Sequence, residues 1–86
     1  MKSILINLTN FTLVKQCFII DNNKITDVEE ITSLDSNTIH KLAIKYNINL
    51  IEFVGNKDYV LGLIKHLQEE NNTQFNTNIE LKYREI

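Results

Sequence analysis

The chain has 86 residues, a net charge of −2, 43% hydrophobic residues and a single cysteine. This length predicts one small domain spanning residues 1–86, and the ordinary apolar fraction excludes a long disordered chain. The weak net charge provides no overall basic field for nucleic acid, and one cysteine excludes both an internal disulfide and a cysteine-rich zinc site. We expect a small soluble domain in the cytoplasm, with a reduced thiol and no contact with a membrane.

Three strands are predicted in the first third of the chain. Apolar residues alternate with other residues over residues 3–8 and 13–20, which is the period of a strand. The segment 21–24 (Asp-Asn-Asn-Lys) predicts a hairpin turn, because asparagine tolerates the positive φ that such a turn requires. Residues 25–31 predict a third strand, and their acidic side chains suit a sheet edge that must not pair with another chain.

A helix is predicted after these strands. Apolar residues recur at helical spacing over residues 39–46 and predict one buried stripe. Ser33, Asp35 or Ser36 can cap the start of the helix, and Asn47 can end it in a left-handed conformation.

The next strand is predicted to be the centre of the fold. Residues 50–54 form an apolar run broken only by Glu52, which predicts a strand covered on both faces. Gly55 ends the run, and Asn56 or Asp58 can cap a second helix by accepting bonds from its first N–H groups.

The second helix and a last strand complete the predicted domain. An apolar stripe over residues 60–67 predicts the helix, and the polar segment 69–78 is predicted as the loop that ends it. Apolar and charged residues alternate over residues 79–86, which predicts a last strand at a free sheet edge. The predicted fold is a single α+β domain of order β-β-β-α-β-α-β, with a mixed five-stranded sheet and two helices.

Three short segments resemble RuvC-type Holliday-junction resolvases of the RNase H-like superfamily, whose core has the same order of elements. Residues 4–7 (Ile-Leu-Ile-Asn) resemble the first strand of that family, which has a catalytic aspartate at the position of Asn7. Residues 50–53 are similar to the strand with the catalytic glutamate, here Glu52, and residues 80–86 resemble the strand that follows. The resemblance implies an RNase H-like fold and a nuclease ancestry.

The chain departs from that family in the carboxylates that hold two metal ions. Such a site needs several charged oxygen ligands, but residues 1–20 contain neither aspartate nor glutamate. The sequence also stops at the last strand, where the family continues into a helix with further acidic residues. We therefore expect a degenerate and truncated copy without nuclease activity, in which Asn7 and Glu52 are the remnants of a metal site.

Two further groups of residues have both a structural and a functional interpretation. His40, His66 and Cys17 would form a metal or nucleophilic site only if the fold brought them together, and ordinary packing explains each of them. A second group lies between a strand and a helix, where backbone N–H groups can bind an anion or simply form a capped turn. Its members are Gly55, Asn56, Lys57 and Asp58.

These patterns predict a fold without an assembled catalytic site. We expect a non-enzymatic protein-interaction module that needs no cofactor and binds a host factor or a second copy of itself. Abundant asparagine, isoleucine and lysine, with no proline, favour a phage or mobile-element origin. The alternative is a nucleic-acid-binding or degenerate metal-dependent nuclease-like protein. The residues expected at an interface are Tyr59, Phe75, Tyr83 and Arg84.

Overall fold

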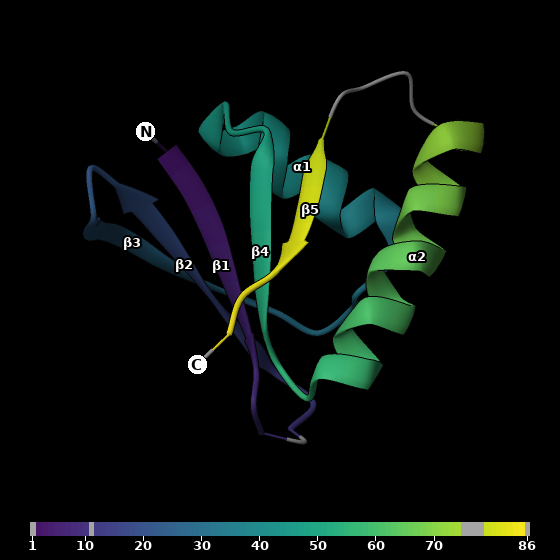
Figure 1. The fold of residues 1–86 in the computed structure, drawn as a ribbon. Helices are drawn as coiled ribbons and strands as arrows, with labels where there is room; N and C mark the ends of the chain where they lie inside the picture. Colours follow the sequence, from purple (N-terminus) through teal and green to yellow (C-terminus); the bar gives the residue numbers. More distant parts are fainter. Residues whose placement is uncertain (1, 11, 75–78, 86) are drawn as a thin grey trace.

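The computed structural model describes residues 2–10, 12–74 and 79–85, and over residues 70–74 it describes the backbone only. It has the predicted order β-β-β-α-β-α-β, with a mixed five-stranded sheet and two helices (Figure 1). The elements are β1 (Lys2–Leu8), β2 (Lys15–Asp21), β3 (Lys24–Ile31), α1 (Ser36–Tyr46), β4 (Leu50–Gly55), α2 (Lys57–Gln74) and β5 (Glu80–Tyr83).

The strands lie in the order β3-β2-β1-β4-β5, so β3 and β5 are the outermost strands. β1, β2 and β3 pair antiparallel, whereas β1 with β4 and β4 with β5 pair parallel. Each helix connects parallel strands, and right-handed connections that run in the same direction across a sheet place their helices on the same side. Figure 1 shows α1 and α2 on one side of the sheet.

The core lies between this side of the sheet and the two helices. Ile6 on β1 lies opposite Cys17 on β2 and Phe53 on β4, and all three side chains are fully buried. α1 adds Ile39 and α2 adds Val60 to the same cluster. Burial of a large apolar side chain such as Phe53 contributes about 1.5–3 kcal/mol to folding.

Asparagine and aspartate form the turns and caps that the sequence predicts. Asn22 and Asn23 have φ angles of 51° and 65° in the β2–β3 hairpin. The Asp35 side chain caps α1 by accepting a 2.8 Å hydrogen bond from the backbone N–H of Thr38. Asn47 ends α1 in the left-handed conformation, with φ at 53°. These local predictions are confirmed.

Three predicted boundaries are corrected. The prediction of a loop over 69–78 is wrong in its first part, because α2 continues to Gln74; residues 69–74 contain no glycine or proline to stop a helix. β2 begins at Lys15, two residues later than predicted, because β3 ends opposite Lys15 and offers residues 13 and 14 no partner. β5 ends at Tyr83, short of the predicted 86. Neither helix, as far as it is described, is apolar and long enough to span a bilayer.

A polar cluster connects the outermost strand β3 to the first helix. The Tyr46 hydroxyl on α1 hydrogen-bonds to Glu29 at 2.5 Å and to Asp27 at 3.1 Å. Lys45 forms an ion pair with Glu29 at 3.0 Å. The Tyr46 hydrogen bond, followed by the Lys45 bond, lowers the pKa of Glu29, and the bond to Glu29 raises the pKa of Tyr46.

Candidate functional site

The prediction that the central strand is covered on both faces is wrong, because the two helices cover only one face of the sheet. We call the opposite face the open face. Its apolar side chains neither belong to the core cluster nor pack against it. They are Leu5, Phe18, Ile20, Ile25, Val28, Leu50 and Val54.

The apolar residues of the open face form a continuous patch over β3, β2 and β1. Val28 lies opposite Phe18, and Phe18 lies opposite Leu5, so the three form one row across the strands. Ile25 and Ile20 face each other in the next row. Val28 is 48% and Ile25 is 60% exposed, and they lie in neighbouring rows of the same face, which is unusual for aliphatic side chains. The patch is therefore the strongest candidate for a contact surface.

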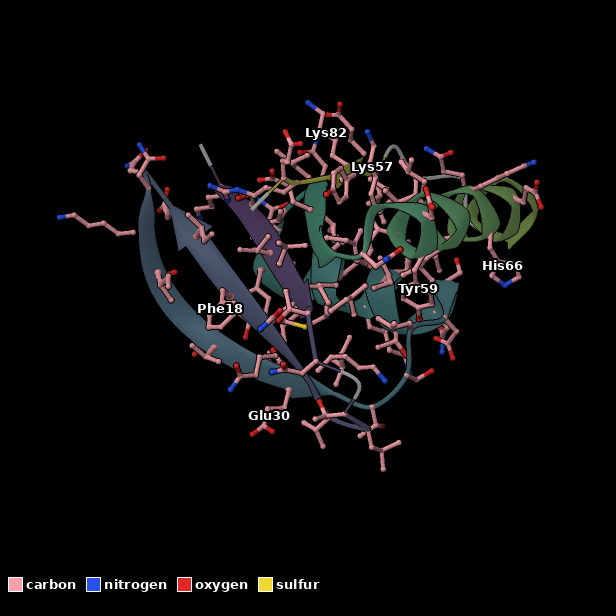
Figure 2. The ribbon with its side chains drawn as sticks, turned by 60° about the horizontal axis from the view of Figure 1, so that its bottom comes forward. Phe18, Glu30, Lys57, Tyr59, His66 and Lys82 are labelled. Carbon is pink, nitrogen blue, oxygen red and sulfur yellow. The ribbon has the colours of Figure 1, made fainter. Side chains whose placement is uncertain are left out.

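Charged residues flank the patch on both sides. Glu30 lies on β3, and Arg84 follows β5 at the opposite end, where it forms a 3.9 Å ion pair with Glu52. Two shallow hollows lie on the open face. One of about 310 Å³ includes Asn7 and Glu30, and one of about 370 Å³ includes Glu52 and Arg84. In Figure 2, Phe18 and Glu30 lie over the strands, away from the helices.

Asn7 and Glu52, the predicted remnants of a metal site, share the open face but do not face each other. Asn7 lies opposite Val54, and its side-chain oxygen accepts hydrogen bonds from the Thr9 backbone N–H at 3.0 Å and the Thr9 hydroxyl at 2.6 Å. Glu52 lies opposite Leu5 and pairs with an arginine. Within residues 2–10, 12–74 and 79–85, no three histidine, cysteine or acidic side chains come together as metal ligands would. The two residues thus serve a turn and an ion pair.

The turn from Gly55 to Asp58 has a structural explanation. The side-chain oxygen of Asn56 accepts a 3.0 Å hydrogen bond from the Tyr59 backbone N–H and so caps α2, as predicted. Gly55 is needed because a Cβ atom there would lie 2.8 Å from the backbone oxygen of Leu8. Lys57 and Asp58 form the exposed first turn of α2. Anion binding at this turn stays a prediction.

The three predicted interface residues that the structure describes do not form one surface. Tyr59 is 51% exposed on the first turn of α2, whereas Tyr83 is half-buried on β5 against the core. Arg84 belongs to the open face. Phe75 lies outside the described residues. Of the three that the structure describes, Arg84 lies beside the apolar patch.

Cys17, His40 and His66 are not brought together. Cys17 is buried in the sheet, and burial, with a smaller contribution from Glu29, raises the pKa of its thiol to about 12. A thiol with so high a pKa is a poor nucleophile at neutral pH. His40 lies on α1, and His66 is an exposed residue of α2 (Figure 2).

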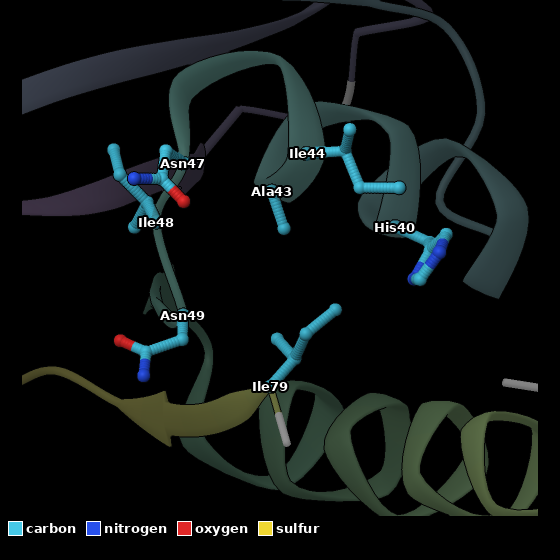
Figure 3. Close-up of a pocket in the computed structure, with 7 residues that line it drawn as sticks. All are labelled: His40, Ala43, Ile44, Asn47, Ile48, Asn49 and Ile79. Atoms are coloured by element: carbon cyan, nitrogen blue, oxygen red, sulfur yellow. The ribbon is translucent and has the colours of Figure 1, made fainter. Parts of the chain in front are cut away.

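A further hollow of about 330 Å³ lies between the end of α1 and the start of β5 (Figure 3). Apolar side chains such as Ala43, Ile44 and Ile79 line it together with the amide side chains of Asn47 and Asn49. Among the described residues that line it, histidine is the one titratable type, which is too little for a metal or acid–base site.

The open apolar face was not predicted from the sequence. A signal for it exists in residues 17–20 (Cys-Phe-Ile-Ile), which are apolar on both faces of β2. Burial of Cys17 and Ile19 leaves the larger Phe18 and the adjacent Ile20 on the uncovered side.

No family model matches the chain, and neither a curated protein nor a solved structure matches it. The resemblance to the RNase H-like superfamily therefore stays a prediction that depends on short sequence segments.

Proposed function

We propose that this protein is a non-enzymatic protein-interaction module whose open face binds an amphipathic helix of a partner protein. The observation that carries the proposal is the row of Val28, Phe18 and Leu5. An apolar sheet face is stable when a second layer covers it, and helices are one of the layers that cover sheets. An exposed apolar patch of adjacent residues is also typical of a protein-binding surface.

The dimensions and charges of the open face indicate what kind of partner helix it can bind. The patch extends over three strands, which separates the outer two by about 10 Å, close to the diameter of one helix. Glu30 on one side favours a basic residue of the partner, and Arg84 on the other side favours an acidic one. The proposed partner helix therefore has an apolar stripe with a basic flank and an acidic flank.

Composition supports a more specific form of this proposal, in which a phage or mobile element encodes the protein and the partner is a cytoplasmic host factor. The alternative function, nucleic-acid binding or residual nuclease activity, would place DNA on the same face near Asn7 and Glu52. The apolar row carries no cation to contact phosphate. This feature favours a protein partner.

Three synthetic helices that share one apolar stripe test the proposal: one has a basic and an acidic flank, one has two acidic flanks, and one has two basic flanks. We expect the mixed helix to bind most tightly and to shift the NMR signals of Leu5, Phe18 and Val28. Val28→Lys should abolish this binding, because it places a charge in the apolar row that contacts the helix. Ile44→Lys is the matched control, since Ile44 is 65% exposed on α1.

Signal shifts confined to the helical side, or equal binding by the Val28→Lys variant, would contradict the proposal. Cleavage of branched DNA with Mg²⁺ or Mn²⁺, lost on Glu52→Ala, would establish the alternative function instead.

A further inference from the structure

The two edges of the sheet differ in their ability to accept another strand. On β3, the side-chain oxygen of Asp27 accepts a 2.8 Å hydrogen bond from the backbone N–H of Val28. This edge also has acidic residues and a register irregularity next to Ile20, and both features discourage strand pairing. On the other side, the described residues of β5 carry one acidic and one basic side chain, and they show neither a side chain bonded to the strand's own backbone N–H nor a register irregularity.

The backbone of β5 presents hydrogen-bonding groups at this second edge. The N–H of Glu80 donates to the Asn49 oxygen at 2.7 Å, and the N–H of Arg84 donates to the Phe53 oxygen at 2.8 Å. Successive residues of a strand direct their N–H and C=O groups to alternate sides. Leu81 and Tyr83 therefore direct theirs away from β4.

The side chains of β5 form a self-complementary pattern about Leu81. Residues 79–83 read Ile-Glu-Leu-Lys-Tyr, which is apolar, negative, apolar, positive, apolar. We propose that a second copy of this chain pairs with β5 antiparallel, with Leu81 opposite Leu81 on a two-fold axis. Glu80 then lies opposite Lys82 of the second copy, and Ile79 lies opposite Tyr83.

In this register, opposite charges face each other and the outward backbone groups form hydrogen bonds. Glu80 and Lys82 are 61% and 55% exposed and 3.4 Å apart within one strand, so both side chains can also reach the second copy. Opposite charges that face each other across antiparallel strands are stabilising, and like charges are destabilising. Because Leu81 directs its backbone groups outward, the facing Leu81 residues exchange both of their hydrogen bonds.

The inference is independent of the open face, because it concerns the edge of the sheet. A pairing of so few residues buries less surface than a standard interface, so we expect a weak dimer that depends on protein concentration. Its specificity comes from the order of the two charges along β5.

Charge exchange tests the register by sedimentation equilibrium over a range of protein concentrations. We expect the wild type to dimerise, and Glu80→Lys or Lys82→Glu each to raise the dimer Kd roughly tenfold or more, because like charges then face each other. A mixture of the two variants should form a heterodimer, since each then supplies the charge that the other needs. A chain with both substitutions should dimerise like the wild type. Lys41→Glu is the control for Lys82→Glu, with the same change in net charge on α1.

Two further results decide the inference. A wild-type chain that stays monomeric at the highest concentration, or two single variants that do not associate when mixed, would overturn it. Val28→Lys should leave the dimer intact. Loss of the dimer in that variant would show that two copies meet through the open face, which refutes the edge pairing but not the proposed use of that face.

Discussion

The structure requires a glycine at one of the two glycine positions of the chain but not at the other. Gly55 ends β4 where the chain passes so close to β1 that an added Cβ atom would lie 2.8 Å from the backbone oxygen of Leu8. Gly62 lies within α2, and an added Cβ atom there would meet nothing within 4 Å. The first glycine is required by the close approach of two strands, whereas the second only makes the helix less stable.

We therefore predict opposite effects for the same substitution. Gly62→Ala should raise the free energy of unfolding by about 0.5–1 kcal/mol, because alanine favours the helix. Gly55→Ala should lower it by about 1–3 kcal/mol, because the backbone of β1 must move. Urea denaturation followed by circular dichroism measures both. Equal and small effects at the two positions would contradict the close approach of β4 to β1.

At the scale of elements, the contact between β3 and α1 depends on ionised Glu29. Its pKa is lowered from the ordinary value of 4.5, first by the Tyr46 hydrogen bond and then by Lys45. A carboxylate with a lowered pKa stabilises the fold above its unfolded pKa, and this contribution is lost as pH falls through its folded pKa. The contact should therefore weaken below pH 4.5.

Tyr46→Phe tests this dependence, because it removes the hydroxyl and keeps the ring. We expect the variant to be less stable than the wild type at pH 7 and to lose less stability on acidification, since Glu29 then titrates nearer its ordinary pKa. Urea denaturation at several pH values between 7 and 3 measures the difference. Tyr59→Phe is the control, because Tyr59 lies on α2 and does not contact Glu29. Parallel pH profiles for the wild type and Tyr46→Phe would contradict the assignment.

A structural feature could be predicted from the sequence when the residues that determine it lie close together along the chain. Asn22, Asp35 and Asn47 were correctly predicted because a turn or cap depends on neighbours within four residues. The side of β2 that is covered was not predictable from its own residues, because Phe18 is more apolar than the buried Cys17. The side is determined by the path of two helices, which is a property of the whole chain.

The candidate site was less predictable than the fold. Asn7 and Glu52 were correctly predicted to lie in strands, but their partners, Thr9 and Arg84, decide what each side chain does. The sequence does not specify these partners, since the Glu52–Arg84 pair joins segments far apart in the chain. The open face itself is visible only when the register of β1, β2 and β3 is known.

For the whole molecule, Cys17 is a probe of global unfolding. Its side chain is 0% exposed, and burial raises the pKa of its thiol to about 12. In a small domain with one core, exposure of this central position requires most of the structure to open.

We predict that a thiol reagent reacts negligibly with the native chain at pH 8 and completely in denaturant. The rate of native labelling should follow the unfolding equilibrium, so Gly55→Ala should accelerate it and Gly62→Ala should slow it. A chain with an added exposed thiol, Asn37→Cys, provides the control and should react with one equivalent at once. Rapid labelling of the wild-type chain would show that the sheet does not protect this position.

The protection of β3 by Asp27 and its acidic neighbours limits how far copies of this chain can assemble. A sheet with two receptive edges can add chains without end and grow into a fibre. A pair formed at β5 would have a β3 strand at each outer edge of the joined sheet. The features of β3 described above discourage pairing with a further strand. The proposed pairing at β5 would therefore end at two chains.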